Sequence, residues 1–333
     1  MVVIHSYPWA VFLLFITMLC WGSWANTQKM ATKKWPFQLY YWDYALGVLL
    51  LSLLMAFTAG SIGNEGRSFL VDLAQADASA VGSAFLGGVV FNIANILLVA
   101  AIAIAGMAVA FPIGIGLALV IGVVVNYIAT PLGNPLLLFV GVGLVTSAIV
   151  LDALAYRKLP SSTPKSTSKG VLISLLAGFL MGFFYRFVAA SMATDFANPE
   201  IGRLTPYTAS VIFAMGLLIS NFVWNTIFMY KPLAGEKVTY HDYFSKGTTR
   251  LHLIGILGGV IWSIGMTLNI IAAEQAGFAI SYGLGQGATL VAALWGVFIW
   301  KEFKGAKGVN GLLAAMFACF VIGLTLIILA RLL

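Results

Sequence analysis

Long apolar stretches recur ten times along this chain of 333 residues. A helix of about 20 apolar residues, rising about 1.5 Å per residue, crosses the hydrocarbon core of a bilayer. Within that core every backbone N–H and C=O must be paired inside the segment, so each stretch is expected to be helical. The predicted spans are approximately residues 9–28, 38–59, 80–104, 107–128, 135–156, 169–190, 206–230, 251–273, 276–300 and 308–331. The sequence therefore predicts an all-α integral membrane protein with ten transmembrane helices.

The composition excludes a water-soluble globular domain. Hydrophobic residues make up 61% of the chain and charged residues only 9%, whereas soluble domains carry roughly 25% charged residues. The net charge of +7 comes from Lys and Arg that lie mostly in polar loops between spans. This placement indicates membrane orientation and contact with anionic lipids, and not nucleic acid. The two cysteines and three histidines show no ligand spacing, so no disulfide, metal or cofactor is expected.

A weak internal repeat covers the third and fourth spans and the eighth and ninth. Segment 86–124 matches segment 257–295 without gaps, at an offset of 171 residues. The offset superposes five glycines of the first copy on glycines of the second: Gly87, Gly88, Gly106, Gly114 and Gly116. In each copy the second helix opens on a glycine-broken run, FPIGIG at 111–116 and YGLGQG at 282–287. Interrupted helices at matching places in two halves are the best sequence indication of a transporter's central binding site.

The longest polar and proline-bearing joint divides the chain into two halves of five spans. The predicted domains are a first repeat at 1–156, a cytoplasmic linker at 157–168 and a second repeat at 169–333. Because each half has an odd number of spans, the two repeats are expected to be inverted relative to each other. Fourteen of the 18 Lys and Arg residues fall in loops on one face, which the positive-inside rule makes cytoplasmic. Both termini are therefore expected on the outer, periplasmic side of the inner (plasma) membrane.

Polar side chains inside spans are costly, and by default they face a pathway or each other. Six polar or aromatic residues gather in the third and eighth spans and at the broken start of the ninth: Asn92, Asn95, Trp262, Asn269, Tyr282 and Gln286. Amide donors and acceptors between aromatic walls suit a neutral polar ring such as a sugar, a ureide or a nucleobase. The alternative is that each amide only ties neighbouring helices together through a hydrogen bond that contributes about 0.6 kcal/mol.

Several charged side chains also fall within predicted spans. Arg186 and Glu274 both lie toward the outer face, where they are expected to pair as a gate, or Arg186 to contact an anionic or carbonyl group of the solute. The alternative is a snorkelling arginine and an interfacial glutamate that never meet. Asp43 is a candidate proton-coupling carboxylate, because burial raises the pKa of an acid; its aromatic neighbours equally suit an interfacial belt. Asp152 is expected to form a local ion pair with Arg157.

Short motifs at five places carry a family resemblance. They are Trp21-Gly22-Ser23-Trp24; Trp42-Asp43-Tyr44; Gly87-Gly88 followed by Asn92 and Asn95; Gln275-Ala276-Gly277-Phe278-Ala279; and Leu294-Trp295-Gly296-Val297-Phe298 with Glu302-Phe303. These stretches resemble the ureide permeases and the related glucose/ribose porters of the drug/metabolite transporter superfamily. The resemblance implies secondary active uptake of a small neutral solute at a site between the halves, and it adds Trp21 and Trp24 to the solute-binding residues. Two features depart from the family: the central joint is short, and Arg186 matches no motif.

The resulting interpretation is an importer that works by alternating access, with a small-molecule solute and membrane lipids as partners. A proton is the expected coupling ion, with Asp43 or Glu274 as the titrating group. An exporter of drugs or metabolites with the same fold is the alternative within this class. An intramembrane enzyme is disfavoured, because no nucleophile, metal-binding or paired-carboxylate motif occurs in the sequence. The sequence leaves the substrate undetermined, as well as the choice between a monomer and a homodimer.

Overall fold

The computed structural model describes residues 1–31, 35–159 and 168–333, and this part of the chain is helical, without a β-strand. Ten of its helical segments are long and apolar enough to cross a membrane. They are α1–α2 (Tyr7–Ala31), α3 (Phe37–Phe57), α5 (Ala78–Ala105), η1–α7 (Phe111–Ala129), α8 (Pro135–Tyr156), α9 (Ser168–Ser191), α10 (Pro206–Tyr230), α12 (Thr249–Ala276), α13–α14–η2 (Phe278–Ile299) and α15 (Asn310–Leu329). The predicted ten-span, all-α membrane class is confirmed. Of the predicted linker, residues 160–167 lie outside the described part.

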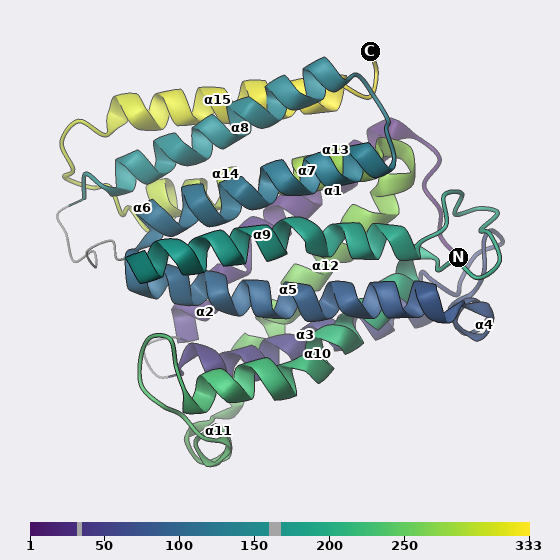
Figure 1. The fold of residues 1–333 in the computed structure, drawn as a ribbon, viewed down its shortest axis with the longest axis horizontal. Helices are drawn as coiled ribbons and strands as arrows, with labels where there is room; N and C mark the ends of the chain where they lie inside the picture. The colour runs from purple at the N-terminus through teal and green to yellow at the C-terminus, as the bar shows by residue number, and fades with distance from the viewer. Residues whose placement is uncertain (32–34, 160–167) are drawn as a thin grey trace.

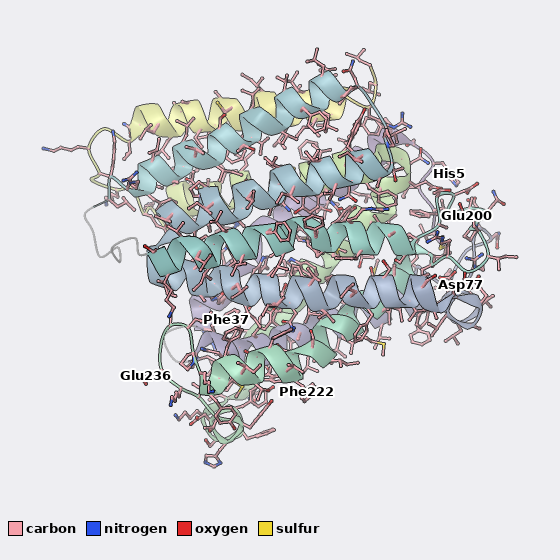
Figure 2. All side chains as sticks on the ribbon, viewed as in Figure 1. His5, Phe37, Asp77, Glu200, Phe222 and Glu236 are labelled. Carbon is pink, nitrogen blue, oxygen red and sulfur yellow. The ribbon has the colours of Figure 1, made fainter. Side chains whose placement is uncertain are left out.

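The spans lie side by side, and both chain termini are at the same end of the bundle (Figure 1). Helix α4 (Phe69–Gln75) lies at that end, which we call the terminal face, and α11 (Tyr240–Lys246) lies at the other. Figure 2 places His5, Asp77 and Glu200 at the terminal face and Glu236 at the opposite end. We call this opposite end the basic face, because the loops there contain most of the Lys and Arg residues in the described part of the chain (Figure 1). The sides of the bundle expose apolar groups such as Phe222, which is 61% exposed, as lipid contact requires.

The two predicted helix interruptions are present. The first is a π-helical turn, η1 (Phe111–Ile115), which contains Pro112; proline has no N–H to donate, and a π-turn absorbs the lost bond. The second is a turn at residues 286–287 that separates α13 (Phe278–Gly285) from α14 (Ala288–Leu294). Helices α5 and α12, which precede the two interrupted spans, both end at a glycine with positive φ: 79° at Gly106 and 86° at Gly277. This conformation favours glycine.

Close backbone contacts join helices of the two halves. Helix α3 packs on α12, and α10 packs on α5. A Cβ atom at Gly259 would lie 2.0 Å from the backbone oxygen of Tyr44, and one at Gly88 would lie 2.0 Å from that of Phe213. Only glycine permits such an approach between helices. Gly88 and Gly259 are related by the offset of the sequence repeat, so these contacts favour the repeat; its inverted relation stays a prediction.

Candidate functional site

A cavity of about 200 Å³ lies between the two halves of the chain. Helices α1, α2 and α5 and the π-turn η1 line it from the first half, and α9, α12 and α14 line it from the second. Both interrupted segments reach it, through Phe111 and Ile115 on one side and Gln286 on the other. The sequence repeat therefore pointed to two segments that meet at one cavity.

In the described part of the chain, six aromatic side chains line the cavity, among them Trp21, Phe91, Phe184 and Trp262. Trp21 and Trp262 stack with ring centroids 5.9 Å apart, and the Trp21 Nε1–H donates to the backbone oxygen of Trp262 at 3.2 Å. The Phe91 ring lies 4.4 Å from Trp262, and Phe184 lies 5.1 Å from Phe91. These rings hold one another in place before any solute arrives. Their flat faces are suited to stacking on a planar ring.

A few polar side chains interrupt the apolar wall: Gln28, Asn95, Gln286 and Thr289. The Asn95 Nδ2 group donates to Tyr41 Oη at 3.2 Å, whereas its Oδ1 atom makes no hydrogen bond within the described residues. The side-chain amide of Gln286 likewise has no partner in that part of the chain, although the backbone around it is fixed by Thr289. Asn95 therefore offers an acceptor to a solute, and Gln286 offers both a donor and an acceptor.

The structure brings five of the nine sequence-predicted solute-binding residues to this cavity: Trp21, Trp24, Asn95, Trp262 and Gln286. No sequence motif indicated Gln28, Thr289 or most of the apolar wall. Gln28 lies beyond the motif that singled out Trp21 and Trp24, and Thr289 lies three residues after Gln286. A helical spacing of three or four residues from the predicted positions identifies both of them.

The other four predicted residues, Asn92, Arg186, Asn269 and Tyr282, do not line the cavity. Asn92 donates to Leu217 O and Ser220 Oγ of α10, and Asn269 donates to Ser281 O of α13. Tyr282 donates to the backbone oxygens of Ala118 and Met181 at 3.2 Å each. In this conformation these three side chains tie neighbouring helices together, which is the alternative that the sequence left open for buried amides.

Two expected ion pairs are absent among the described residues. Arg186 and Glu274 form no ion pair; Glu274 Oε1 instead accepts a hydrogen bond of 2.6 Å from the backbone N–H of Phe196. Asp152 does not pair with Arg157 either, and its Oδ1 atom is buried without a partner. The expectation for Asp152 rested on closeness in sequence. Arg157 comes directly after the last residue of α8, whereas the Asp152 side chain is buried in the protein interior.

The cavity lies in the half of the bundle nearest the basic face. Helix α5 begins beside α4 at the terminal face (Figure 1), and its lining residues, Phe91 to Ile102, occupy the later part of the helix. In the first span the lining continues from Trp21 to Gln28, close to the end of α2. The rings of Phe91, Phe184 and Trp262 come from the middle of α5, α9 and α12 and contact one another. We call them the aromatic floor, because they separate the cavity from the terminal face.

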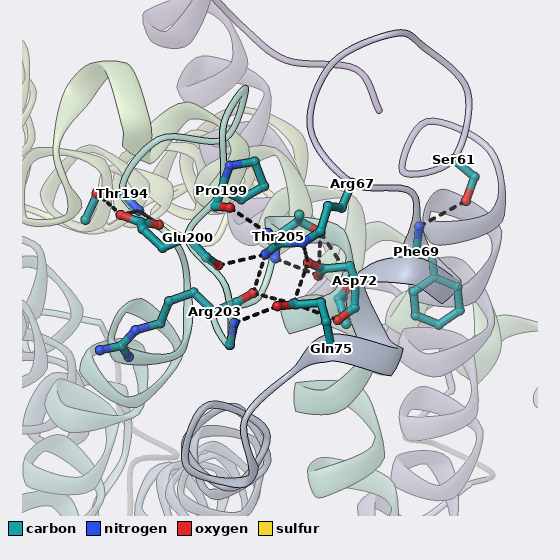
Figure 3. Close-up of polar contacts among 12 residues, drawn as sticks. Ser61, Arg67, Phe69, Asp72, Gln75, Thr194, Pro199, Glu200, Arg203 and Thr205 are labelled. Atoms are coloured by element: carbon teal, nitrogen blue, oxygen red, sulfur yellow. Dashed lines mark hydrogen bonds and ion pairs between the residues drawn. The ribbon is translucent and has the colours of Figure 1, made fainter.

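A hydrogen-bonded network also closes the terminal face (Figure 3). Its members are Arg67, Asp72 and Gln75 of the first half and residues 199–205 of the second, and we call it the terminal latch. Arg67 donates to Asp72 at 2.9 Å and to the backbone oxygen of Arg203 at 2.7 Å. Asp72, which is 0% exposed, accepts from both the backbone N–H and the hydroxyl of Thr205 at 2.8 and 3.0 Å. The latch therefore binds the two halves together on the side away from the cavity.

A buried carboxyl group lies at the basic end of α3. Asp43 Oδ1 accepts a hydrogen bond of 2.6 Å from Tyr243 Oη on α11, and both of its oxygens lie within 3.0 Å of His252 Nδ1 on α12. The Trp35 indole N–H adds a longer bond of 3.4 Å. The side chain of Asp43 is 2% exposed and that of His252 is 28% exposed, so the imidazole connects the carboxyl group to the basic face. Burial and the neighbouring carboxyl group raise the pKa of Tyr243, which keeps its hydroxyl a donor.

Comparisons with known proteins agree with this architecture. The family model for ureide permeases matches residues 40–160 and 158–330. Ureide permease 4 of Arabidopsis thaliana is 24% identical over 392 aligned residues, which cover 96% of each chain, and Ureide permease 2 of the same plant is 24% identical over 91% of this chain and 92% of its own. A probable ureide permease, A3, of Vigna unguiculata is 31% identical over 153 residues, 44% of this chain and 41% of its own.

A solved structure titled only as a crystal structure of a protein shares the fold. Its TM-score is 0.56 at 13% identity, over 97% of this chain and 98% of its own. The family model for ureide permeases, by contrast, matches segments in both halves of the chain. Since the family model covers nearly all of the ten spans, this chain belongs to the ureide permease family.

Proposed function

We propose that this membrane protein carries a small neutral ureide through the central cavity by alternating access. Membership of a permease family indicates a transporter and not an enzyme, and the relatives named as ureide permeases supply the solute class. The observation that carries the proposal is the cavity itself, where aromatic faces stand beside Asn95 Oδ1 and the Gln286 amide, which make no hydrogen bond within the described residues. A ureide has a flat N–C(=O)–N group, whose face can stack on indoles while its edge bonds to amides.

The size of the cavity also favours a small solute. Pockets that bind drug-sized ligands have volumes of about 300–1,000 Å³, and this one has about 200 Å³. None of the described residues that line it is acidic, although lipophilic cations, the usual cargo of broad exporters, are attracted by a carboxylate. Both observations support a neutral ureide over the exporter alternative.

The positive-inside rule supports placing the basic face in the cytoplasm. The closed latch then lies outside, both termini are outside, and the cavity lies nearest the cytoplasm. The conformation described here is therefore the inward-facing one. In the outward-facing conformation the five-span halves, 1–156 and 169–333, tilt relative to each other, so that the latch opens and the cavity closes toward the cytoplasm.

A proton is the proposed coupling ion, and Asp43 is its binding site. The carboxyl group is buried where α3 of the first half meets α11 and α12 of the second, and the partly exposed imidazole of His252 links it to solution. In the inward-facing conformation this route releases the proton to the cytoplasm, after which Tyr243 and His252 hold the bare carboxylate. Glu274 is the weaker candidate, because its carboxyl group holds the backbone of Phe196 in a loop at the terminal face.

Binding of a ureide to the purified protein tests the solute class. We expect allantoin to raise the melting temperature, and neutral sugars to leave it unchanged. We expect Asn95→Ala to raise the Kd for allantoin about five- to tenfold, since one hydrogen bond to a buried amide is worth about 1–1.5 kcal/mol. Isothermal titration of the detergent-solubilised protein measures this change.

Asn92→Ala is the matched control, because it removes the same side chain one helical turn away. Asn92 holds α10 and not the cavity wall, so the variant is expected to melt at a lower temperature and to bind allantoin with unchanged affinity. Stabilisation by sugars alone, or an equal loss of affinity in both variants, contradicts the proposed solute and its binding site.

A further inference from the structure

Tyr44 on α3 holds a buried hydroxyl group behind the cavity wall. Its side chain is 0% exposed, and its Oη atom has no hydrogen-bond partner within the described residues. A buried polar group left in this way costs about 1–3 kcal/mol, and most buried polar groups in native structures are paired. We therefore expect another state of the protein to supply the partner that the Tyr44 hydroxyl lacks in this conformation.

The surroundings of Tyr44 identify that state. Its ring lies 5.0 Å from the Trp24 ring and 6.4 Å from the Trp262 ring, and both indoles line the cavity. On its other side it stacks on Tyr41 at 5.1 Å, and the Tyr41 hydroxyl accepts the hydrogen bond of Asn95, a cavity residue. Tyr44 is thus one layer behind the wall, beside the polar group that faces the solute.

Trp24 is the part of the wall that can uncover this hydroxyl. It lies at the junction between α1, which ends at Ser23, and α2, which begins at Ala25. Its indole N–H makes no hydrogen bond within the described residues, so the ring can rotate without breaking a hydrogen bond to that part of the chain. The backbone of Tyr44, in contrast, is fixed against α12 by the close approach of Gly259. The indole therefore moves more easily than α3.

We propose that the Tyr44 hydroxyl is a further solute-binding group, which donates a hydrogen bond to a carbonyl oxygen of the bound ureide once the Trp24 indole has moved aside. This inference rests on the proposed function. The free Asn95 Oδ1 atom supplies the complementary acceptor for a solute N–H. Tyr44 and Asn95 together then recognise a carbonyl and an N–H on one solute, a combination that ureides carry and sugars lack.

The variant Tyr44→Phe keeps the ring and removes only the hydroxyl. We expect the unliganded variant to melt at the same temperature as the wild type or higher, because an unpartnered polar group has been removed. We expect its Kd for allantoin to rise about five- to tenfold, the effect of one lost hydrogen bond. Thermal unfolding and isothermal titration measure the two effects, and a merely structural tyrosine does not produce them together.

Tyr185→Phe is the matched control. Tyr185 is also fully buried with an unpartnered hydroxyl, but it lies outside the cavity wall. We expect it to retain the wild-type affinity. If the wild type binds allantoin and Tyr44→Phe binds it equally well, the inference fails and the proposed function stands. If the wild type binds no ureide, the proposed function fails, and this inference fails with it.

Discussion

Replacement of Asp43 by asparagine is expected to abolish proton-driven accumulation of solute and to leave solute exchange across the membrane intact. Asparagine has the same shape as aspartate but cannot bind and release a proton. One proton that moves down a gradient of one pH unit supports about tenfold accumulation of a neutral solute, equivalent to about 1.4 kcal/mol. In proteoliposomes with such a gradient, we expect the wild type to approach a tenfold ratio of inner to outer solute concentration. The Asp43→Asn variant should stop when the two concentrations are equal.

A second carboxylate close to Asp43 supplies the control. Asp242 lies on α11 beside Tyr243, and hydrogen bonds from Lys246 and Thr239 lower its pKa to about 2. A group with this pKa stays ionised near neutral pH, so it carries no proton through the transport cycle. Asp242→Asn should accumulate solute like the wild type. If the Asp43→Asn variant still accumulates solute, Asp43 is not the coupling site, and Glu274 becomes the candidate.

The sequence predicted the spans well, because span ends coincide with residues whose physical effects are local. The predicted spans at 135–156 and 206–230 agree with α8 and α10 at both ends. Each helix begins with a proline, Pro135 or Pro206, which lacks the N–H that a first turn leaves unpaired. The interruptions of the fourth and ninth spans were predictable for a similar reason, since glycine and proline weaken a helix wherever it packs.

The partner that each buried side chain faces was not predictable, because it depends on helices distant in the sequence. Asn92 and Asn95 are one turn apart on α5 and equivalent by pattern, yet one bonds to α10 and the other lines the cavity. Asp43 and His252 are 209 positions apart, and no motif spacing connects them. The hydrophobic pattern specifies which residues are buried in a membrane helix, but not which neighbouring helix they meet.

The second large effect is expected from opening the terminal latch. In Asp72→Ala, Arg67 loses its carboxylate and Thr205 loses the acceptor of two hydrogen bonds. Removing one partner of a buried pair costs about 3–5 kcal/mol. In the proposed transport cycle these bonds form only while the terminal face is closed, so the cost falls on the conformation that we propose is inward-facing. The population should therefore move toward the outward-facing conformation by about 100-fold or more.

Labelling of a cysteine introduced at Ser281 measures this shift. Ser281 is fully buried in α13, on the terminal side of the aromatic floor, so a membrane-impermeant thiol reagent should reach it only when the terminal face opens. In a background without Cys20 and Cys319, we expect Ser281→Cys to label rapidly with Asp72→Ala and slowly without it. Asp195→Asn removes a carboxylate that accepts hydrogen bonds from Asn198 within the same loop, and it should leave labelling slow. Equal labelling with and without Asp72→Ala means that the helix packing beneath the latch, and not the latch, keeps this face closed.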